Sequence, residues 1–387
     1  MKATTKRLTL ATAAMLVASV ACAQTTPSGL PNTLAWSAYG VGAGGYNQAV
    51  AIGNALKQKY GVNLRVLPGK NDISRTLPLR EGQVQFSAHG IGAYMSQEGF
   101  YEFGAKDWGP QPVRVLLLNN SDQVLGPVTA KDAGIKTVAD IKGKRVAWVI
   151  GAPALNQNIT AVLAFSNLTW ADVKKVEFGG FGASMDGLIN NQVDVAWTSS
   201  ISGKAYALAK SPRGISYPTI SHADKEGWKR LQSYAPYYVP FYGKEGADLK
   251  ASTPVETGAY PYPLLVAYAK QDPKLVKAMT AAMVDTFADY KTAAPGNAGW
   301  ELSLQNFSWV IPYHDGAISY FKDKGLWTAE HEKNNAMLIK RQEVLATAWK
   351  NVKSRTHADE AAFAQDWMKT RAAALTQAGM APVLTTW

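Results

Sequence analysis

The stretch "TLAWSAYGVGAGGYNQAVAIGNALKQKYGVNLRVLP", residues 33–68, decides the fold class of this chain. An apolar run is followed by a glycine-rich loop, an amphipathic run from about Tyr46 to Tyr60, and a second apolar run. This order predicts a strand, a helix and another strand, the unit from which parallel α/β sheets are built. Because a helix begins with unpaired N–H groups, the loop before it is a candidate site for an anionic or polar ligand.

The same loop also fits a dinucleotide-binding pattern. Gly40, Gly42 and Gly45 match G-x-G-x-x-G, but that site usually has an acidic residue at the end of the next strand to bind the ribose. The next strand ends in Pro68 and Gly69, so we expect no dinucleotide and no other cofactor. Two interpretations stay open, a tight turn without a ligand and a polar-ligand site at the helix start.

A similar series of apolar and amphipathic runs recurs from "KRVAWVI" (residues 144–150) to "VDVAWTSS" (residues 193–200). It predicts helices at residues 159–168 and 188–192, each preceded by a loop, at residues 151–158 and 181–187. Two such units predict an α/β protein with two lobes, each a mainly parallel sheet flanked by helices. Ligands of such sheets bind beyond the carboxyl ends of the strands, so a ligand cleft is expected between the lobes. This is the arrangement of two-lobed periplasmic binding proteins that close about a hinge, and we expect a type II-like fold.

The expected division into lobes is discontinuous. Lobe 1 comprises residues 32–120 and 255–387, including a C-terminal helical extension, and lobe 2 comprises residues 121–254. The last part of the chain is expected to return to the first lobe and brace it. The elements expected there are a strand at residues 263–269 and helices at residues 273–291 and 330–353.

The first 23 residues are typical of an export signal. Basic residues precede an apolar run over residues 8–20, which is too short to span a bilayer. Ala21 and Ala23 predict cleavage after residue 23, and a periplasmic location follows from this interpretation. Cys22 offers lipid attachment as an alternative, although Ser19 stands where lipoprotein signals usually have a large aliphatic residue.

Composition narrows the possible chemistry of the mature chain. Cys22 is the only cysteine, so cleavage would remove thiol nucleophiles, cysteine-ligated zinc and disulfides together. Removing Lys2, Lys6 and Arg7 lowers the formal net charge from +11 to +8. The remaining charge is dispersed along the chain, which favours solubility first, an anionic ligand second, and no nucleic-acid partner.

Candidate ligand-binding residues lie at the ends of the predicted strands and in the loops that follow them. His89 is either a buried structural histidine or a ligand contact, and the amides of Asn156 and Gln157 could bind a carboxylate or cap a helix. Lys70 and Arg75 flank another loop, where solvated surface positions are the simplest expectation. No catalytic or metal-ligating residue is expected. The complete candidate set is Tyr39, Gly44, Gly45, Tyr46, Asn71, His89, Gly151, Pro153, Asn156, Gln157, Ser184, Trp197, Thr198 and Ser199.

Several of these segments resemble motifs of one family, the TAXI-type substrate-binding proteins of tripartite ATP-independent periplasmic (TRAP) transporters. The motifs are Gly44-Gly45-Tyr46 at a helix start, "PGKNDISRTLPLREGQVQFS" (residues 68–87), "IKTVADIKGKRVAWVIGAP" (residues 135–153) and "VIPYHDGAISYFKDKGLW" (residues 310–327). The resemblance covers residues 33–327.

The resemblance implies a receptor that binds a small anionic or zwitterionic solute, an organic acid or amino acid of dicarboxylate or glutamate type. It implies delivery of that solute to TRAP membrane permease subunits, which are driven by an ion gradient, and a monomer when free. Two alternatives stay open: an exported enzyme that uses the same cleft, and a sensory or adhesin-like interaction protein.

Overall fold

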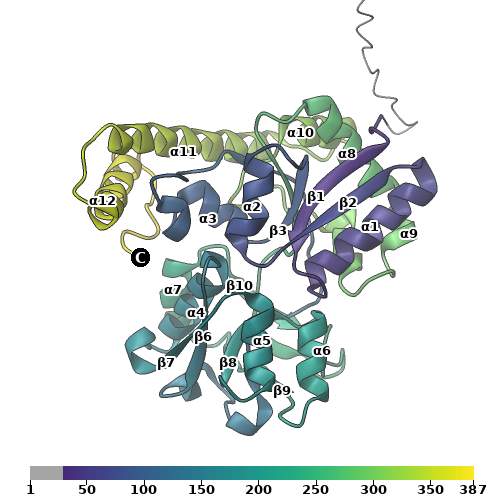
Figure 1. Cartoon of the computed structure of the whole chain (residues 1–387). Coiled ribbons are helices and arrows are strands. Elements are labelled where there is room, and N and C mark those ends of the chain that lie inside the picture. The colour runs from purple at the N-terminus through teal and green to yellow at the C-terminus, as the bar shows by residue number, and fades with distance from the viewer. Residues whose placement is uncertain (1–28) are drawn as a thin grey trace, which may run out of the picture.

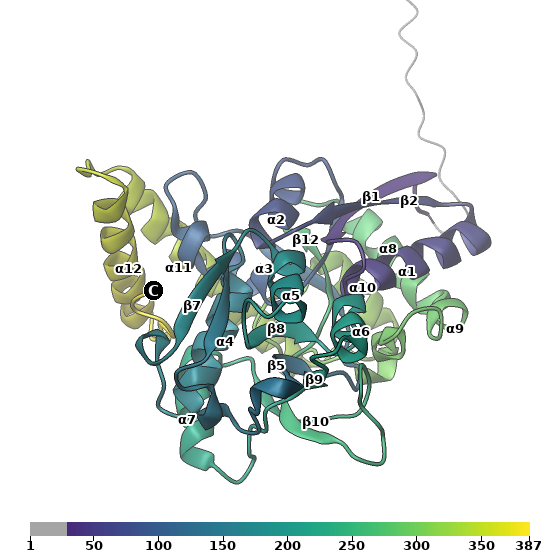
Figure 2. The ribbon, with the colours of Figure 1, turned by 60° about the horizontal axis from the view of Figure 1, so that its bottom comes forward.

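Two five-stranded sheets organise the chain into two lobes. The computed structural model describes residues 29–387, so the predicted export signal lies outside the described residues. Figure 1 shows lobe 1, which contains β1 to β3, above lobe 2, which contains β6 to β9. Figure 2 gives a second view of the same two lobes.

The sheet of lobe 1 has the strand order β2-β1-β3-β12-β4. The first three strands in this order run parallel, and β12 runs antiparallel to both of its neighbours. The strands are β1 (Thr33–Tyr39), β2 (Asn63–Gly69), β3 (Phe86–His89), β4 (Val113–Leu118) and β12 (Leu264–Tyr268). The helices of this lobe are α1 (Gly44–Tyr60), α2 (Asp72–Arg80), α3 (Gly92–Glu98), α8 (Pro273–Asp285), α9 (Phe287–Tyr290) and α10 (Asp315–Asp323).

Lobe 2 repeats this arrangement with the strand order β7-β6-β8-β5-β9, and β5 runs antiparallel to β8. Its strands are β5 (Leu125–Ala130), β6 (Arg145–Val149), β7 (Lys174–Phe178), β8 (Val195–Ser199) and β9 (Ile215–Ser216). Its helices are α4 (Pro153–Phe165), α5 (Phe181–Ile189), α6 (Gly203–Lys210) and α7 (Lys225–Tyr234), and a separate ribbon pairs β10 (Val239–Gly243) with β11 (Val255–Ala259).

The antiparallel strand of each sheet follows from how the chain crosses between the lobes. The chain enters lobe 2 through residues 119–124 and returns to lobe 1 through residues 260–263, and β5 and β12 come directly after these crossings. The carboxyl ends of the parallel strands face the opposite lobe, so a strand that enters from that lobe runs the other way. The predicted fold class, two mainly parallel α/β lobes in a type II-like arrangement, is confirmed.

Helix α1 shows why the opening stretch folds as predicted. Gln48, Ala49, Ile52 and Leu56 are buried on one face at helical spacing. The helix ends at Gly61, whose φ of +71° is in the left-handed region that favours glycine. The helix begins at Gly44, so Gly44 and Gly45 of the expected loop belong to its first turn.

Two helices of lobe 2 begin earlier than the sequence indicated. The helix expected from residue 159 begins at Pro153, and the helix expected from residue 188 begins at Phe181. Proline suits the first position of a helix because its missing N–H would have no acceptor there. The predicted loop residues Asn156, Gln157 and Ser184 therefore lie inside helices.

The last two helices, α11 (Ala329–Lys353) and α12 (Glu360–Gln377), pack against lobe 1 (Figure 1). They are fixed to it by Glu98 of α3, which is 0% exposed. Arg341 donates to both carboxylate oxygens of Glu98, at 2.8 and 2.7 Å, and Arg371 pairs with the same carboxylate. Burial alone would raise the pKa of Glu98, but Arg371 and Arg341 outweigh burial and hold it below its ordinary value.

We expect the substitution Arg371→Met to lower the free energy of unfolding by about 3–5 kcal/mol, because it breaks a buried ion pair. Arg355→Met is a matched control, since Arg355 pairs with Asp366 at a largely exposed position and should contribute about 0–1 kcal/mol. Urea unfolding gives both values. Equal losses for the two variants would contradict a stabilising role for the buried cluster.

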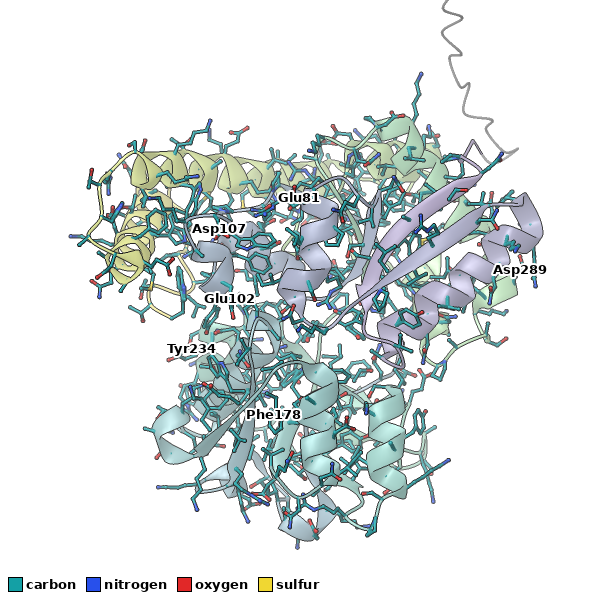
Figure 3. The ribbon with its side chains drawn as sticks, viewed as in Figure 1. Glu81, Glu102, Asp107, Phe178, Tyr234 and Asp289 are labelled. Atoms are coloured by element: carbon teal, nitrogen blue, oxygen red, sulfur yellow. The ribbon has the colours of Figure 1, made fainter. Side chains whose placement is uncertain are left out.

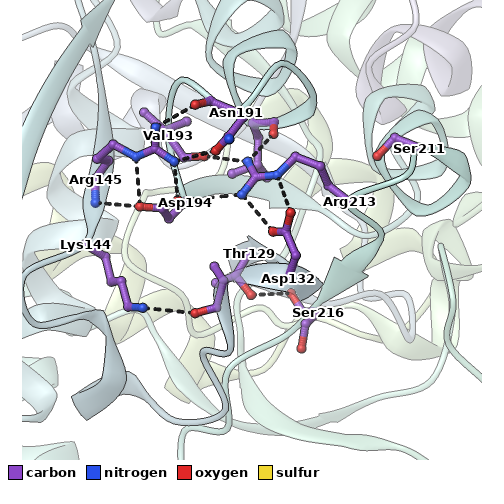
Figure 4. Close-up of polar contacts among 12 residues, drawn as sticks. Thr129, Asp132, Lys144, Arg145, Asn191, Val193, Asp194, Ser211, Arg213 and Ser216 are labelled. Atoms are coloured by element: carbon purple, nitrogen blue, oxygen red, sulfur yellow. Dashed lines mark hydrogen bonds and ion pairs between the residues drawn. The ribbon is translucent and has the colours of Figure 1, made fainter.

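A second charged cluster lies at the amino ends of β6 and β8 in lobe 2, and Figure 4 shows its contacts. Arg145, the first residue of β6, donates to both oxygens of Asp194, at 3.0 and 2.6 Å. Arg213 lies 3.7 Å from Asp194 and forms a second two-bond pair with Asp132. Burial would raise the pKa of Asp194, but its hydrogen bonds with Arg145 and the charge of Arg213 hold it below its ordinary value.

A lowered pKa in the folded state has a defined effect on stability. The contribution of Asp194 is complete above the pKa of an unfolded aspartate, about 3.9, and is lost as the pH falls through the folded pKa. The difference in unfolding free energy between wild type and Asp194→Asn should therefore be constant above about pH 5 and shrink below about pH 4. Urea titrations across this range measure it, and a difference that persists at acid pH would disprove the linkage.

Candidate ligand-binding site

A cavity of about 220 Å³ lies between the two lobes, at the carboxyl ends of their parallel strands. Its walls come from the loops after β1, β2 and β3 in lobe 1 and after β6, β7 and β8 in lobe 2. Pockets for drug-sized ligands measure roughly 300–1,000 Å³. The cavity therefore suits a small solute, and it lies where the fold predicts a ligand.

The wall of lobe 1 is built around Arg75. Its guanidinium lies 3.8 Å from the centroid of the Tyr39 ring and pairs with the carboxylate of Asp72. Arg75 is only 2% exposed, so the expected solvated surface position is wrong. The stacked ring replaces part of the lost hydration through a cation–π interaction, and Asp72 supplies the opposite charge.

Two glycines make room for the Tyr39 ring. A Cβ atom on Gly45 would lie 2.5 Å from the ring, and one on Gly90 would lie 2.2 Å from the Tyr39 hydroxyl. Gly44 instead packs against lobe 2, where its Cβ would lie 3.3 Å from Ile201. Gly44 and Gly45 are predicted ligand-binding residues, but protein side chains occupy the space beside them and neither lines the cavity.

The hydrogen bonding of Arg75 is incomplete. The Nη2 atom donates to Asp72 Oδ1, whereas the buried Nε atom has no hydrogen-bond partner among the described residues. Buried donors in native proteins nearly always have an acceptor. Because Arg75 lines the cavity, a bound anion is a natural source of that acceptor.

The wall of lobe 2 carries three residues predicted from the sequence, Trp197, Thr198 and Ser199, at the end of β8. The Thr198 hydroxyl lies 3.0 Å from the Ser202 hydroxyl, and the Ser199 hydroxyl donates to Gln123 at 2.5 Å. Together with Tyr39 and Asn71 of lobe 1, these residues are the predicted candidates that the structure brings together around the cavity.

The two lobes meet at the rim of the cavity through reciprocal capping of α2 and α4. The N–H of Asp72, at the start of α2, donates to the carbonyl of Gly151 at 3.1 Å. The N–H of Ala154, at the start of α4, donates to Asp72 Oδ2 at 3.0 Å. Each helix start thus has an acceptor from the opposite lobe. Asn71 adds a bond from Nδ2 to the carbonyl of Ile150 at 3.3 Å.

Three further hydrogen bonds join the lobes in the same way. Gly203, at the start of α6, donates to the carbonyl of Gly42 at 2.9 Å, and Phe181, at the start of α5, donates to the carbonyl of Lys70 at 3.4 Å. The Gly151 N–H donates to Glu102 Oε1 at 3.0 Å. Figure 3 shows Glu102 on the edge of lobe 1 that faces lobe 2. The structure therefore has the lobes closed on each other.

His89 lies behind this site and does not line the cavity. Its Nδ1 accepts from the Gly90 N–H at 3.0 Å, and Nε2 lies 2.9 Å from the hydroxyl of Thr76, which itself donates to the carbonyl of Asp72. This chain of bonds requires the proton on Nε2. Burial and the charge of Arg75 lower the pKa of His89 well below its ordinary value, so the ring is neutral.

The other predicted residues lie outside the cavity lining. Tyr46 borders a separate surface depression with Asp289, because the turn of α1 directs it away from lobe 2. The Asn156 amide exchanges two hydrogen bonds with the backbone of Val149, both at 2.9 Å, and the Ser184 hydroxyl donates to a carbonyl of its own helix. Pro153 begins α4 beside the lining residues Ala152 and Ala154, and Gln157 accepts from Tyr101 of lobe 1.

Several lining residues were missed from the sequence. Asp72 and Arg75 belong to the buried face of α2 with Thr76 and Leu79, at spacings of three, four and seven residues. Leu79 is the apolar member of that face. Counting back from Leu79 by four and seven residues gives Arg75 and Asp72, so helical spacing indicates that both are buried. Tyr260 and Tyr262 lie in the second crossing, where no helical or strand period marks them.

The strand order, the two crossings and the interlobe cavity define the fold of two-lobed periplasmic binding proteins. The chain belongs to the NMT1-like family, whose model matches residues 40–325. Among curated proteins, no significant match to the chain was found. In residues 29–387, no helix is long and apolar enough to cross a bilayer, and no group of three or more His, Asp or Glu side chains could hold a metal ion.

Solved structures similar to this chain include binding proteins at low sequence identity. An ancestral arginine-binding protein bound to arginine is 16% identical, with a TM-score of 0.41, over 68% of this chain and 97% of that chain. A protein from Bordetella bronchiseptica RB50 is 17% identical, with a TM-score of 0.44, over 79% and 92%. The alkanesulfonate-binding protein of Xanthomonas axonopodis pv. citri, bound to MOPS, is 12% identical, with a TM-score of 0.41, over 77% and 95%.

The substitution Gly151→Ala should open the cleft, because the new Cβ would lie 2.5 Å from the Asn71 amide at the closed rim. Gly143→Ala is a matched control. Both glycines have a left-handed φ, +71° for Gly151 and +74° for Gly143, so either alanine should lower the free energy of unfolding by about 1–2 kcal/mol. A Cβ on Gly143, however, meets no atom within 4 Å. Small-angle X-ray scattering should give a larger radius of gyration for Gly151→Ala alone. Identical radii for both variants would refute the role of this rim.

Proposed function

We propose that this protein is an extracytoplasmic solute-binding receptor that captures a small organic acid or amino acid between its lobes. The observation that supports this most directly is the buried guanidinium of Arg75, which lines a small interlobe cavity with an unpaired Nε. A buried cation with a free donor is suited to an anionic ligand. The closed rim would then separate the bound solute from bulk water.

The proposed ligand contacts combine predicted and newly located residues. Hydrogen bonds to a charged group contribute about 1.5–3 kcal/mol each, and micromolar affinity requires about 8 kcal/mol. A few donors near Arg75, together with packing on aromatic rings, are therefore sufficient. The proposed contacts are Tyr39, Asn71, Arg75, Trp197, Thr198, Ser199, Tyr260 and Tyr262.

We further propose that the receptor delivers its solute to a TRAP-type permease driven by an ion gradient, as a TAXI-type member of its family. The support is the export-signal pattern of residues 1–23 and the resemblance of the four motif segments to that group. The same support favours a periplasmic location.

Binding without catalysis is the proposed activity. The ring of His89 is neutral, buried and hydrogen-bonded at both nitrogens. Both oxygens of Asp72 are also engaged, by Arg75 and by the Ala154 N–H. Asp72 therefore links the two lobes, His89 is bonded within lobe 1, and neither is free to accept a proton from a bound solute.

Native mass spectrometry of gently purified protein tests this proposal. We expect one small organic acid or amino acid per chain, lost on unfolding, and a thermal shift when it is added back. Thr198→Phe, which fills part of the cavity, should abolish retention, whereas Thr253→Phe at an exposed position should not. A protein that carries no solute and shows no shift with a broad panel of carboxylates and amino acids would contradict the proposal.

A further inference from the structure

We infer that the solute is a compact organic monoanion with an apolar body and no ammonium group. This inference rests on the proposed receptor function and specifies the chemical class of its solute. It follows from three properties of the cavity: one buried cation, one acid whose two oxygens are both hydrogen-bonded, and a remaining wall that is mainly apolar.

The anionic group is placed by Arg75. Among the described residues that line the cavity, the basic ones are Lys70, Arg75 and Lys204. Lys70 is exposed, and Lys204 is about one-third exposed and paired with Asp186. Arg75 is therefore the buried cation of the wall, and its Nε has no protein acceptor. One carboxylate or sulfonate oxygen would satisfy that donor.

An ammonium group has no acidic partner in the same wall. Asp72 is the one acidic side chain among the described lining residues. Its Oδ1 accepts from Arg75, and its Oδ2 accepts from the Ala154 N–H at 3.0 Å. A buried ammonium needs a charged acceptor to offset its lost hydration, and here it would instead lie near the positive charge of Arg75. The cavity therefore disfavours α-amino acids.

A second carboxylate is disfavoured by the rest of the wall. The hydroxyls of Thr198 and Ser199 are already hydrogen-bonded to protein, and the other lining side chains include Ile91, Leu125, Leu155, Trp197 and Tyr262. An anion placed against them would lose hydration without gaining a partner. An apolar chain or ring would instead remove apolar surface from water, at about 25 cal/mol per Å². The wall therefore favours an apolar body on the single anionic group.

Matched pairs of solutes test this inference with ligand-free mature protein in isothermal titration calorimetry. The probes are 4-methylpentanoate against leucine, which differ by an ammonium group, glutarate against glutamate, and 4-methylpentanol as the uncharged counterpart. We expect 4-methylpentanoate to bind about tenfold or more tightly than each of the others, a difference of about 1.4 kcal/mol or more.

Substitutions assign the preference to Arg75. The double variant Asp72→Asn/Arg75→Gln removes both charges of the pair and leaves no buried ion unpaired, so circular dichroism and thermal melting should show a folded protein. It should bind 4-methylpentanoate no better than 4-methylpentanol. Lys210→Gln, which removes an exposed charge at the far end of α6, should retain the wild-type preference.

The outcomes separate this inference from the proposed function. Tighter binding of leucine than of 4-methylpentanoate, or of glutamate than of glutarate, would overturn the inference and leave the receptor function in place. Tighter binding of glutarate than of 4-methylpentanoate would have the same consequence. Unchanged preference in the folded double variant would overturn the role of Arg75. If no probe bound and native mass spectrometry found no retained solute, both the inference and the proposed function would fail.

Discussion

The closed form of this protein depends on Asp72, which caps a helix in the opposite lobe while its own N–H is bound there in return. A helix start leaves several N–H groups without acceptors, and a cleft between two α/β lobes brings such starts face to face. Here α2, α4, α5 and α6 each donate to an acceptor from the other lobe. Carbonyl oxygens and the Asp72 carboxylate thus offset part of the positive charge at these helix ends.

The same aspartate organises the site. It fixes Arg75, the guanidinium of Arg75 stacks on Tyr39, and the ring of Tyr39 needs the missing side chains of Gly45 and Gly90. Gly45 in the first turn of α1 and Gly90 after β3 therefore act on the candidate site through the ring of Tyr39. A ligand bound at Arg75 would contact a side chain whose position was set by residues on three different loops of lobe 1.

The fold could be predicted because its signals are local: apolar runs with the period of strands, amphipathic runs with the period of helices, and glycines between them. The site was predicted only in part. Trp197, Thr198 and Ser199 were found because they end a strand, whereas Arg75 was expected on the surface because it is charged, although its spacing of four residues from Leu79 places it on the buried face of α2. The starts of α4 and α5 were missed because Pro153 and Gly182 were interpreted as loop residues.

The polar character of the rim has a thermodynamic consequence. Opening the lobes would exchange the N–H···O bonds of the rim for bonds to water, and the exposure of such polar groups lowers the heat capacity. Capture of a solute with an apolar body would bury its surface against Trp197 and Tyr262 and would give a negative heat-capacity change. The temperature dependence of binding would then report on the apolar surface buried in the cavity, with a contribution of opposite sign from the polar groups of the rim.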